Sequence, residues 1–216
     1  MRFVMKLIKF LIVFVFNIVC AADGKFLLIS GPSGIGKSTI IKELHKLDNR
    51  FQYIKPFTTR PLREGEVDKI HMPLQEMLEL QERGRLVALN YLYGNYYATA
   101  LDPILDALAN GAFPIIDWPI NRVLHMREAL KDQIVSVFLY VDEIEQLSDR
   151  LKLDDRDKTG ERFISGKSEL NAFFRGEFDE LIDYKVNNHH GDASTTAKEI
   201  YTAYLSELSD SEAVLY

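Results

Sequence analysis

Residues 26–39, FLLISGPSGIGKST, contain a short apolar run that ends at a glycine-rich turn. The turn reads G-x-x-x-x-G-K-S-T, the pattern of a loop that binds phosphate groups. Glycines let successive backbone N–H groups turn toward phosphate oxygens, and a following helix adds the positive end of its dipole. The run Phe26–Ile29 predicts a buried strand, and the apolar residues after the loop recur at the spacing of a helix: Ile40, Ile41, Leu44 and Leu47.

The side chains of this phosphate-binding loop (P-loop) have distinct predicted roles. Lys37 brings a positive charge to the β- and γ-phosphates of a nucleotide, and Ser38 brings a hydroxyl to Mg²⁺. The predicted cofactors are therefore ATP and Mg²⁺. The predicted nucleotide-binding residues are Gly31, Pro32, Ser33, Gly34, Ile35, Gly36, Lys37, Ser38 and Thr39.

Length, composition and charge limit the class of protein. The chain has 216 residues, 47% of them hydrophobic, which suits one α/β domain with a sizeable core and small insertions. The formal net charge of −6 gives no basic field for nucleic acid, so no nucleic-acid partner is expected. Cys20 is the only cysteine in the sequence, which excludes an intrachain disulfide and a cysteine-based metal site.

The first 22 residues differ from the rest of the chain. Three basic residues, the last of them Lys9, precede a short apolar stretch that is below the roughly 20 residues of a membrane-spanning helix. Small residues at Ala21 and Ala22 fit a signal peptidase site. We expect a cleaved signal peptide over residues 1–22, export or secretion, and no stable membrane span. The alternative is a buried helix or a mis-assigned start, with a cytoplasmic protein.

A second candidate anion site follows the predicted strand Phe51–Phe57. Residues 58–68, TTRPLREGEVD, place Arg60 and Arg63 three residues apart around a proline that restrains the turn. Two planar guanidinium groups at this spacing can clamp one phosphate group with charge-assisted hydrogen bonds. Glu66 can orient the two arginines.

Strands and helices alternate through the remainder, which predicts a parallel sheet. Asp117 ends the apolar run FPIIDW, where ligands collect in an open α/β sheet, and is a candidate ligand of Mg²⁺. The other predicted strands are 134–141 and 183–187, and the predicted helices are 74–83, 102–110, 142–150 and 194–206.

Three motifs in this order resemble the guanylate kinase family of nucleoside monophosphate kinases: GPSGIGKST, then TTRPLREGEVD, then GNYYAT at residues 94–99. The resemblance implies a three-layer α/β P-loop NTPase fold with a parallel sheet over residues 23–208. It also implies a small acceptor-binding insertion at about 56–100 and a mobile lid at about 152–161. The implied reaction moves the γ-phosphoryl group of Mg·ATP to the phosphate of GMP or a related monophosphate.

Further residue roles come from the resemblance alone. The implied acceptor-binding residues are Arg60, Arg63, Glu66, Tyr97, Thr99 and Asp117. The implied catalytic residues, besides Lys37, are Arg150, Arg156 and Arg162, and Asn187 is implied near the adenine. Of these, Arg60, Arg63 and Tyr97 would hold the acceptor phosphate, and Thr99 would touch the base.

Three positions depart from the family's pattern. Ala88 stands where the family has the glutamate that reads guanine, Pro56 stands at the position of a hydroxyl, and Pro119 replaces a second acid after Asp117. Loss of hydrogen-bonding groups redirects the choice of base rather than only weakening it. Two alternatives therefore stay open: a kinase with a different phosphorylated acceptor, and a guanylate-kinase-like binding module without turnover. The sequence does not predict the oligomeric state.

Overall fold

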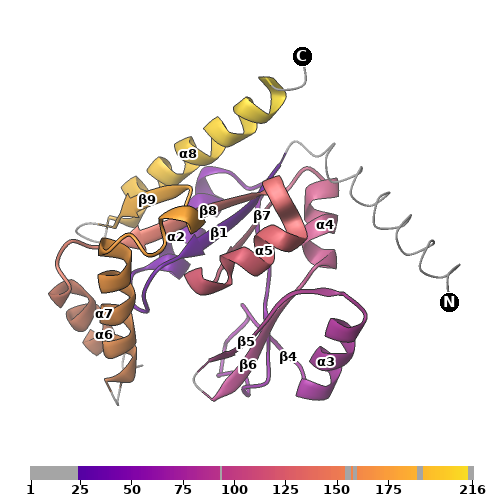
Figure 1. Ribbon diagram of the computed structural model, residues 1–216, viewed down its shortest axis with the longest axis horizontal. Coiled ribbons are helices and arrows are strands. Elements are labelled where there is room, and N and C mark those ends of the chain that lie inside the picture. The colour runs from indigo at the N-terminus through magenta and orange to yellow at the C-terminus, as the bar shows by residue number, and fades with distance from the viewer. Residues whose placement is uncertain (1–23, 93, 154–156, 158–159, 189–191, 214–216) are drawn as a thin grey trace, which may run out of the picture.

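The computed structural model describes residues 24–92, 94–153, 157, 160–188 and 192–213 (Figure 1). The predicted signal segment 1–22, Arg156 and half of the predicted lid lie outside these residues. Among the described helices, none is both long enough and apolar enough to cross a membrane.

A parallel five-stranded sheet forms the centre of the molecule (Figure 1). The strands β1 and β8 read as continuous apolar runs because helices cover both faces of the sheet, and every residue of β1 is buried. The predicted parallel sheet is therefore confirmed. Its strand order is β2 (Phe51–Tyr53), β7 (Phe113–Asp117), β1 (Phe26–Ser30), β8 (Ile134–Tyr140) and β9 (Tyr184–Asn187).

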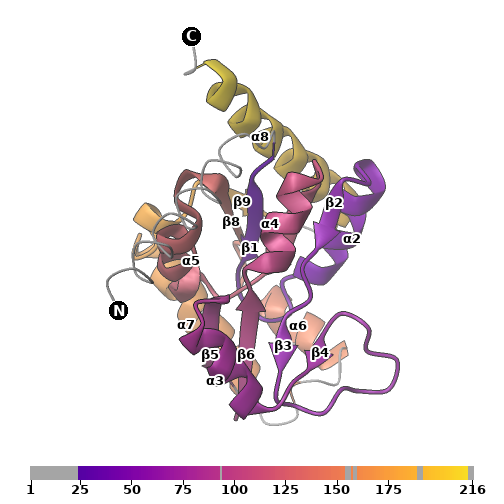
Figure 2. The ribbon, with the colours of Figure 1, turned by 90° about the vertical axis from the view of Figure 1, so that its right-hand side faces the viewer.

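Helices cover the central sheet on both faces (Figures 1 and 2). The helix α2 (Lys37–Leu47) buries Ile40, Ile41 and Leu44 and packs against α8 (Ala193–Ala213), whereas Leu47 is 39% exposed. Right-handed connections between parallel strands place the helices of the other layer on the opposite face. Those helices are α4 (Asp102–Ala109), α5 (Val123–Leu130), α6 (Glu145–Leu153) and α7 (Glu161–Phe174).

A second sheet forms an insertion between β2 and α4 (Figure 2). The prediction of one strand over 51–57 was wrong, because the chain leaves the central sheet after β2 and enters the second sheet at β3. Pro56 lies in the connection, where it cannot donate a hydrogen bond to a ladder and restricts the residue before it. The strand order of the insertion is β4 (Ile70–His71), β3 (Phe57–Thr58), β6 (Asn95–Ala100) and β5 (Leu86–Leu92), with α3 (Leu74–Glu82) beside β5.

Two predicted helix boundaries also differ from the structure. The helix predicted from Asp142 begins at Glu145, because the carboxylate of Asp142 accepts a hydrogen bond from the Asn187 side chain at 2.6 Å instead of capping the helix. The closing helix α8 extends to Ala213, beyond the predicted end at residue 206.

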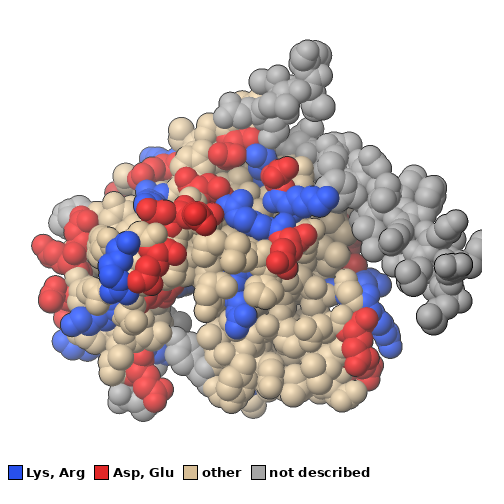
Figure 3. Space-filling model, viewed as in Figure 1, with Lys and Arg blue, Asp and Glu red and all other residues tan. Residues whose placement is uncertain are grey.

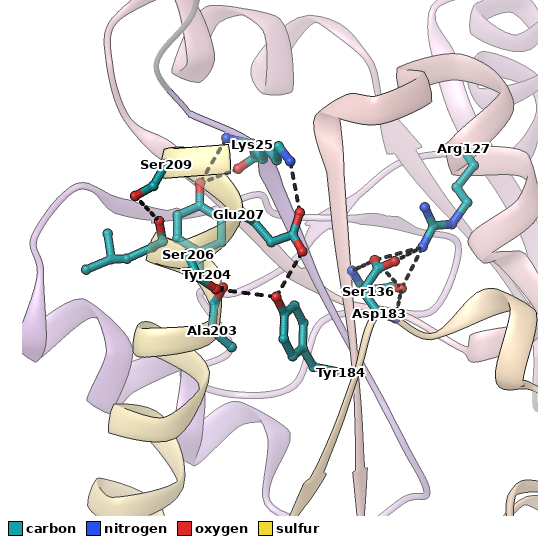
Figure 4. A network of polar contacts seen from close by, with 11 residues as sticks. Lys25, Arg127, Ser136, Asp183, Tyr184, Ala203, Tyr204, Ser206, Glu207 and Ser209 are labelled. Atoms are coloured by element: carbon teal, nitrogen blue, oxygen red, sulfur yellow. Dashed lines mark hydrogen bonds and ion pairs between the residues drawn. The ribbon is translucent and has the colours of Figure 1, made fainter. Parts of the chain in front are cut away.

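Polar contacts attach the last helix and strand to the start of β1 (Figure 4). The hydroxyl of Tyr204, on α8, donates to the backbone oxygen of Lys25 at 2.5 Å. Glu207, one turn later, pairs with the Lys25 ammonium at 3.0 Å and accepts from the Tyr184 hydroxyl at 2.9 Å. The contacts of Lys25 with Tyr204 and Glu207 span 179 and 182 positions of the chain, and together with Tyr184 they hold α8 against the sheet that carries the P-loop.

Charged side chains of both signs alternate over the face shown in Figure 3. That face carries no extended basic patch, and its lower part, over β5 and β6, is mostly uncharged. This agrees with the net charge of −6.

Asp48 joins the end of α2 to α8. Its carboxylate accepts from the Arg50 guanidinium at 2.7 Å and from the Tyr201 hydroxyl at 3.1 Å. The hydrogen bonds from Arg50 outweigh the opposing effect of burial and lower the pKa of Asp48 from 3.8 to about 2. The charged form of Asp48 therefore stabilises the folded state.

Replacing Asp48 tests this contact through its pH dependence. Because the pKa is depressed in the folded state, the stabilisation is complete above pH 3.8 and is lost as the pH falls toward 2. Asp48→Asn should lower the melting temperature at pH 7 by about 2–4 °C, and the difference from the wild type should shrink as the pH falls. Thermal unfolding followed by circular dichroism measures both values.

The matched control is Glu43→Gln, which removes an exposed ion pair with Lys46 and should change the melting temperature little at any pH. If the difference in melting temperature between Asp48→Asn and the wild type stayed the same near pH 2, the ionised carboxylate of Asp48 would not be the source of the stabilisation.

Candidate active site

The P-loop connects the end of β1 to the start of α2 through two glycines that no other residue can replace. Gly31 has φ 132° and Gly36 has φ 105°, which side chains rarely adopt. A Cβ atom on Gly31 would lie 2.5 Å from the Leu139 carbonyl oxygen, and one on Gly36 would lie 2.8 Å from Asn188 Nδ2. The loop is therefore packed directly against β8 and the residue after β9.

A polar cavity of about 410 Å³ opens over this loop. The start of α2 faces it, so backbone N–H groups and the helix dipole favour an anion there. Gly31, Pro32 and Ile35 are buried behind the loop surface. The cavity is lined by Ser33, Gly34, Gly36, Lys37, Ser38, Thr39, Asp117, Arg150, Arg162, Asn188 and Ala193.

Lys37 lies over the loop that precedes it. Its ammonium group donates to the backbone oxygens of Gly31 at 2.6 Å and Pro32 at 3.0 Å. Glu169, on α7, is close enough for the charge of Lys37 to affect it: burial raises the pKa of Glu169, and the positive charge opposes that rise. Sequence analysis missed Glu169, although its spacing of seven from Arg162 places both on one face of a helix.

Two of the three predicted catalytic arginines reach the cavity. Arg150 donates to the backbone oxygens of Ile35 and Asn188, each at 3.1 Å, and burial lowers its pKa. Its guanidinium stays charged because the ordinary pKa of arginine is so high. Arg162 donates to the Ser33 hydroxyl at 3.4 Å. Arg156 lies outside the described residues, so its predicted role is untested.

The two consecutive asparagines at the end of β9, Asn187 and Asn188, have different positions. Asn187, the predicted nucleotide contact, is not among the cavity-lining residues and donates to Asp142. Asn188 lines the cavity, donates to the Ile35 carbonyl at 2.5 Å and accepts from the Thr196 hydroxyl at 3.0 Å. Successive side chains alternate along an extended chain, so only one of the pair faces the loop.

Asp117 lines the cavity from the end of β7, beside β1. The Tyr53 hydroxyl donates to one of its carboxylate oxygens at 2.7 Å. Burial, and then the charge of Asp117, raise the pKa of Tyr53, so this hydroxyl stays protonated and remains a donor. Sequence analysis missed Tyr53, because nothing in its neighbourhood indicates a contact across 64 positions of the chain.

Ser38 and Asp117 suit Mg²⁺ by their chemistry, since both bring oxygen atoms to the same cavity. Among the described residues, no three side chains of His, Cys, Asp or Glu gather into a metal site. Mg²⁺ fits such a sparse set because it keeps several waters and binds substrate phosphates.

Glu66 positions the predicted acceptor clamp, which consists of Arg60 and Arg63. Its carboxylate accepts from the Arg60 guanidinium at 2.6 and 2.8 Å and from the Arg63 backbone N–H at 3.0 Å. Burial would raise the pKa of Glu66, but these hydrogen bonds and the charges of Arg60 and Lys69 lower it to about 2. Glu66, and to a smaller extent the nearby Tyr97, raise the pKa of Arg60.

The clamp and the cavity are separate in this structure. Neither Arg60 nor Arg63 lines the cavity, and the Arg63 side chain is exposed. Thr99, the predicted base contact, is fully buried on β6.

Comparison with known proteins agrees with this geometry. The family model for guanylate kinase matches residues 23–204. The guanylate kinase of Sulfurimonas denitrificans is 31% identical over 195 residues, which cover 88% of this chain and 92% of that protein. The guanylate kinase of Streptococcus pyogenes is 30% identical over 184 residues, 82% of this chain and 84% of that protein.

A crystal structure of guanylate kinase from Anaplasma phagocytophilum has the same fold, with a TM-score of 0.67 at 22% identity and 87% of each chain covered. The three-layer α/β P-loop fold and the resemblance drawn from the sequence motifs are thus confirmed. The chain belongs to the guanylate kinase family.

Proposed function

We propose that this protein is an ATP-dependent nucleoside monophosphate kinase, which transfers the γ-phosphoryl group of Mg·ATP to the phosphate of GMP or a related monophosphate. The observation that carries the proposal is the convergence of Lys37, Arg150 and Arg162 on one cavity above an intact P-loop. Three positive side chains and a helix N-terminus suit the triphosphate, whose charge is the main obstacle to transfer. An active kinase is therefore favoured over a binding module without turnover.

The chain supplies positioning and charge rather than a nucleophile. The P-loop amides and Lys37 hold the β- and γ-phosphates, and the two arginines neutralise the charge of the transferred group. Ser38 and Asp117 would hold Mg²⁺, which would supply charge stabilisation at the phosphate oxygens. Tyr53 fixes the orientation of Asp117 through its hydrogen bond.

The acceptor phosphate binds to Arg60, with Arg63 and Tyr97 beside it. Since these residues lie outside the cavity, the insertion has to move toward the P-loop before transfer. Its two connections to the central sheet, residues 54–56 and Leu101, are short and are the natural hinges.

Lys37→Ala tests the nucleotide site. The cavity loses the cation that holds the phosphates, so kcat should fall by about 10²–10³-fold, as for loss of one preorganised charge-stabilising donor. A coupled assay of ADP release with ATP and a panel of monophosphates measures the rate.

The control is Lys42→Ala, which removes an exposed lysine from the same helix and should leave the rate unchanged. Equal rates in Lys37→Ala and the wild type would show that the P-loop is not the site of transfer.

Arg60→Ala tests the acceptor clamp separately. Removing a charge-assisted contact to the phosphate should raise KM for the monophosphate by about 10- to 100-fold and leave KM for ATP nearly constant. Steady-state kinetics with each substrate varied in turn separates the two constants. The control is Arg83→Ala, at a side chain that is 71% exposed on the same insertion, which should change neither KM value. If Arg60→Ala raised only the KM for ATP, Arg60 would contact ATP and not the monophosphate.

We further propose that residues 1–22 are a signal peptide and that the mature protein is exported. The support is the basic start, the short apolar run and the small residues at Ala21 and Ala22. The intact mass of the protein from its native source should lack all residues through Ala21 or Ala22. A mass that includes them would favour the cytoplasmic alternative.

A further inference from the structure

A third cation, Lys69, lies beside the acceptor clamp, and the proposed mechanism assigns it no role. Its ammonium nitrogen lies 3.6 Å from Oε1 of Glu66, the same oxygen that Arg60 binds at 2.6 Å. The Lys69 and Arg60 side chains are only 23% and 18% exposed. One carboxylate oxygen therefore lies between an ammonium and a guanidinium group, and both cations are partly shielded from water.

The pairing of β4 with β3 brings Lys69 back to the clamp. Residues 59–69 form the loop between the two strands, and β4 begins directly after Lys69. His71 lies beside Thr58 in the parallel pair, and its Nδ1 atom is 3.2 Å from the backbone oxygen of Arg60. The position of Lys69 is therefore fixed by the second sheet as well as by its ion pairs.

The charge of this loop depends on Lys69. Without it, residues 59–69 would carry three acidic and two basic side chains. A phosphate monoester has a charge of about −1.5 to −2 at pH 7, and a loop with net negative charge repels it. The acidic side chains are Glu64, Glu66 and Asp68, and the two other basic ones are Arg60 and Arg63.

The ammonium group of Lys69 has donors to offer a ligand. It carries three N–H groups, and of the residues that the structure describes only Asp68 accepts a hydrogen bond from it, at 3.0 Å. The Asp68 side chain is 48% exposed, and an ion pair so close to water costs little to break. The Arg60 guanidinium, by contrast, is held by Glu66 and by the Pro61 backbone oxygen at 2.8 Å.

We propose that Lys69 is a further binding residue for the acceptor phosphate, and that its ammonium group exchanges Asp68 for a phosphate oxygen when the substrate binds. The proposal rests on the proposed kinase function and adds a residue to its acceptor site. Arg60 orients the phosphate with its planar group, whereas Lys69 supplies a mobile point charge. This combination selects a terminal phosphate, which carries up to two negative charges, over a phosphodiester, which carries one.

A purely structural ion pair between Lys69 and Asp68 is the alternative, and the two partners distinguish it. Lys69→Gln and Asp68→Asn both break the pair. If the pair only stabilises the loop, both variants should change monophosphate binding in the same direction. If Lys69 binds the phosphate, the two changes should be opposite, because Asp68→Asn removes the carboxylate that competes with the phosphate for the ammonium group.

The test measures the binding of GMP, AMP, UMP and CMP by calorimetry without ATP, and steady-state kinetics with the monophosphate that binds most tightly. Lys69→Gln should raise Kd and KM for that monophosphate about 10-fold, the loss of one charge-assisted hydrogen bond. Asp68→Asn should lower both about 2- to 5-fold. Lys69→Arg keeps the charge and should retain most of the affinity, and the KM for ATP should stay constant in all three variants.

Shifts in the same direction, or wild-type values in both variants, would overturn the proposal and leave the kinase function intact. Opposite shifts in Kd without turnover would support the role of Lys69 and contradict the kinase. Failure of all four monophosphates to bind at millimolar concentration would overturn both. Melting temperatures show whether each variant is folded; if Lys69→Gln is not, an unchanged or higher Kd in Asp68→Asn overturns the proposal and a lower one supports it.

Discussion

The close packing of the P-loop backbone against β8 and Asn188 is the constraint on which the rest of the structure depends. At Gly31, even one methyl group would lie 2.5 Å from the Leu139 carbonyl oxygen and would force β1 and β8 apart. Only glycine permits both this approach and the positive φ angle. The resulting turn directs the start of α2 at the cavity, and it supplies the Ile35 carbonyl oxygen that Arg150 and Asn188 bind.

The remaining charged groups follow from this arrangement. Helices α6 and α7 lie against the loop, so their arginines come within reach of any phosphate bound there. The insertion carries a second anion site, in which Glu66 holds Arg60 ready without occupying the cavity. Two separate anion sites on two sheets joined by short connections are suited to phosphoryl transfer, because each substrate binds alone before closure brings them together.

The sequence predicted the features that depend on local pattern, and it missed those that depend on distant contacts. The P-loop, the buried strands and the parallel sheet follow from apolar runs and glycine spacing. The break between β2 and β3 was missed because an apolar run does not reveal which sheet each half joins. Tyr53 with Asp117, and Asn90 with Arg122, are contacts across 64 and 32 positions, for which a single sequence carries no signal.

The most direct test is a crystal structure with a bisubstrate analogue, in which adenosine and a second nucleoside are joined by a chain of phosphates. The central claim is that the amide-lined P-loop and the Arg60 clamp close on the same phosphate chain. The predicted result is one end of the chain beneath Lys37 and the other within hydrogen-bonding distance of Arg60 and Tyr97. An analogue held only by the P-loop, with its second nucleoside in solvent and Arg60 still bound to Glu66 alone, would contradict the account.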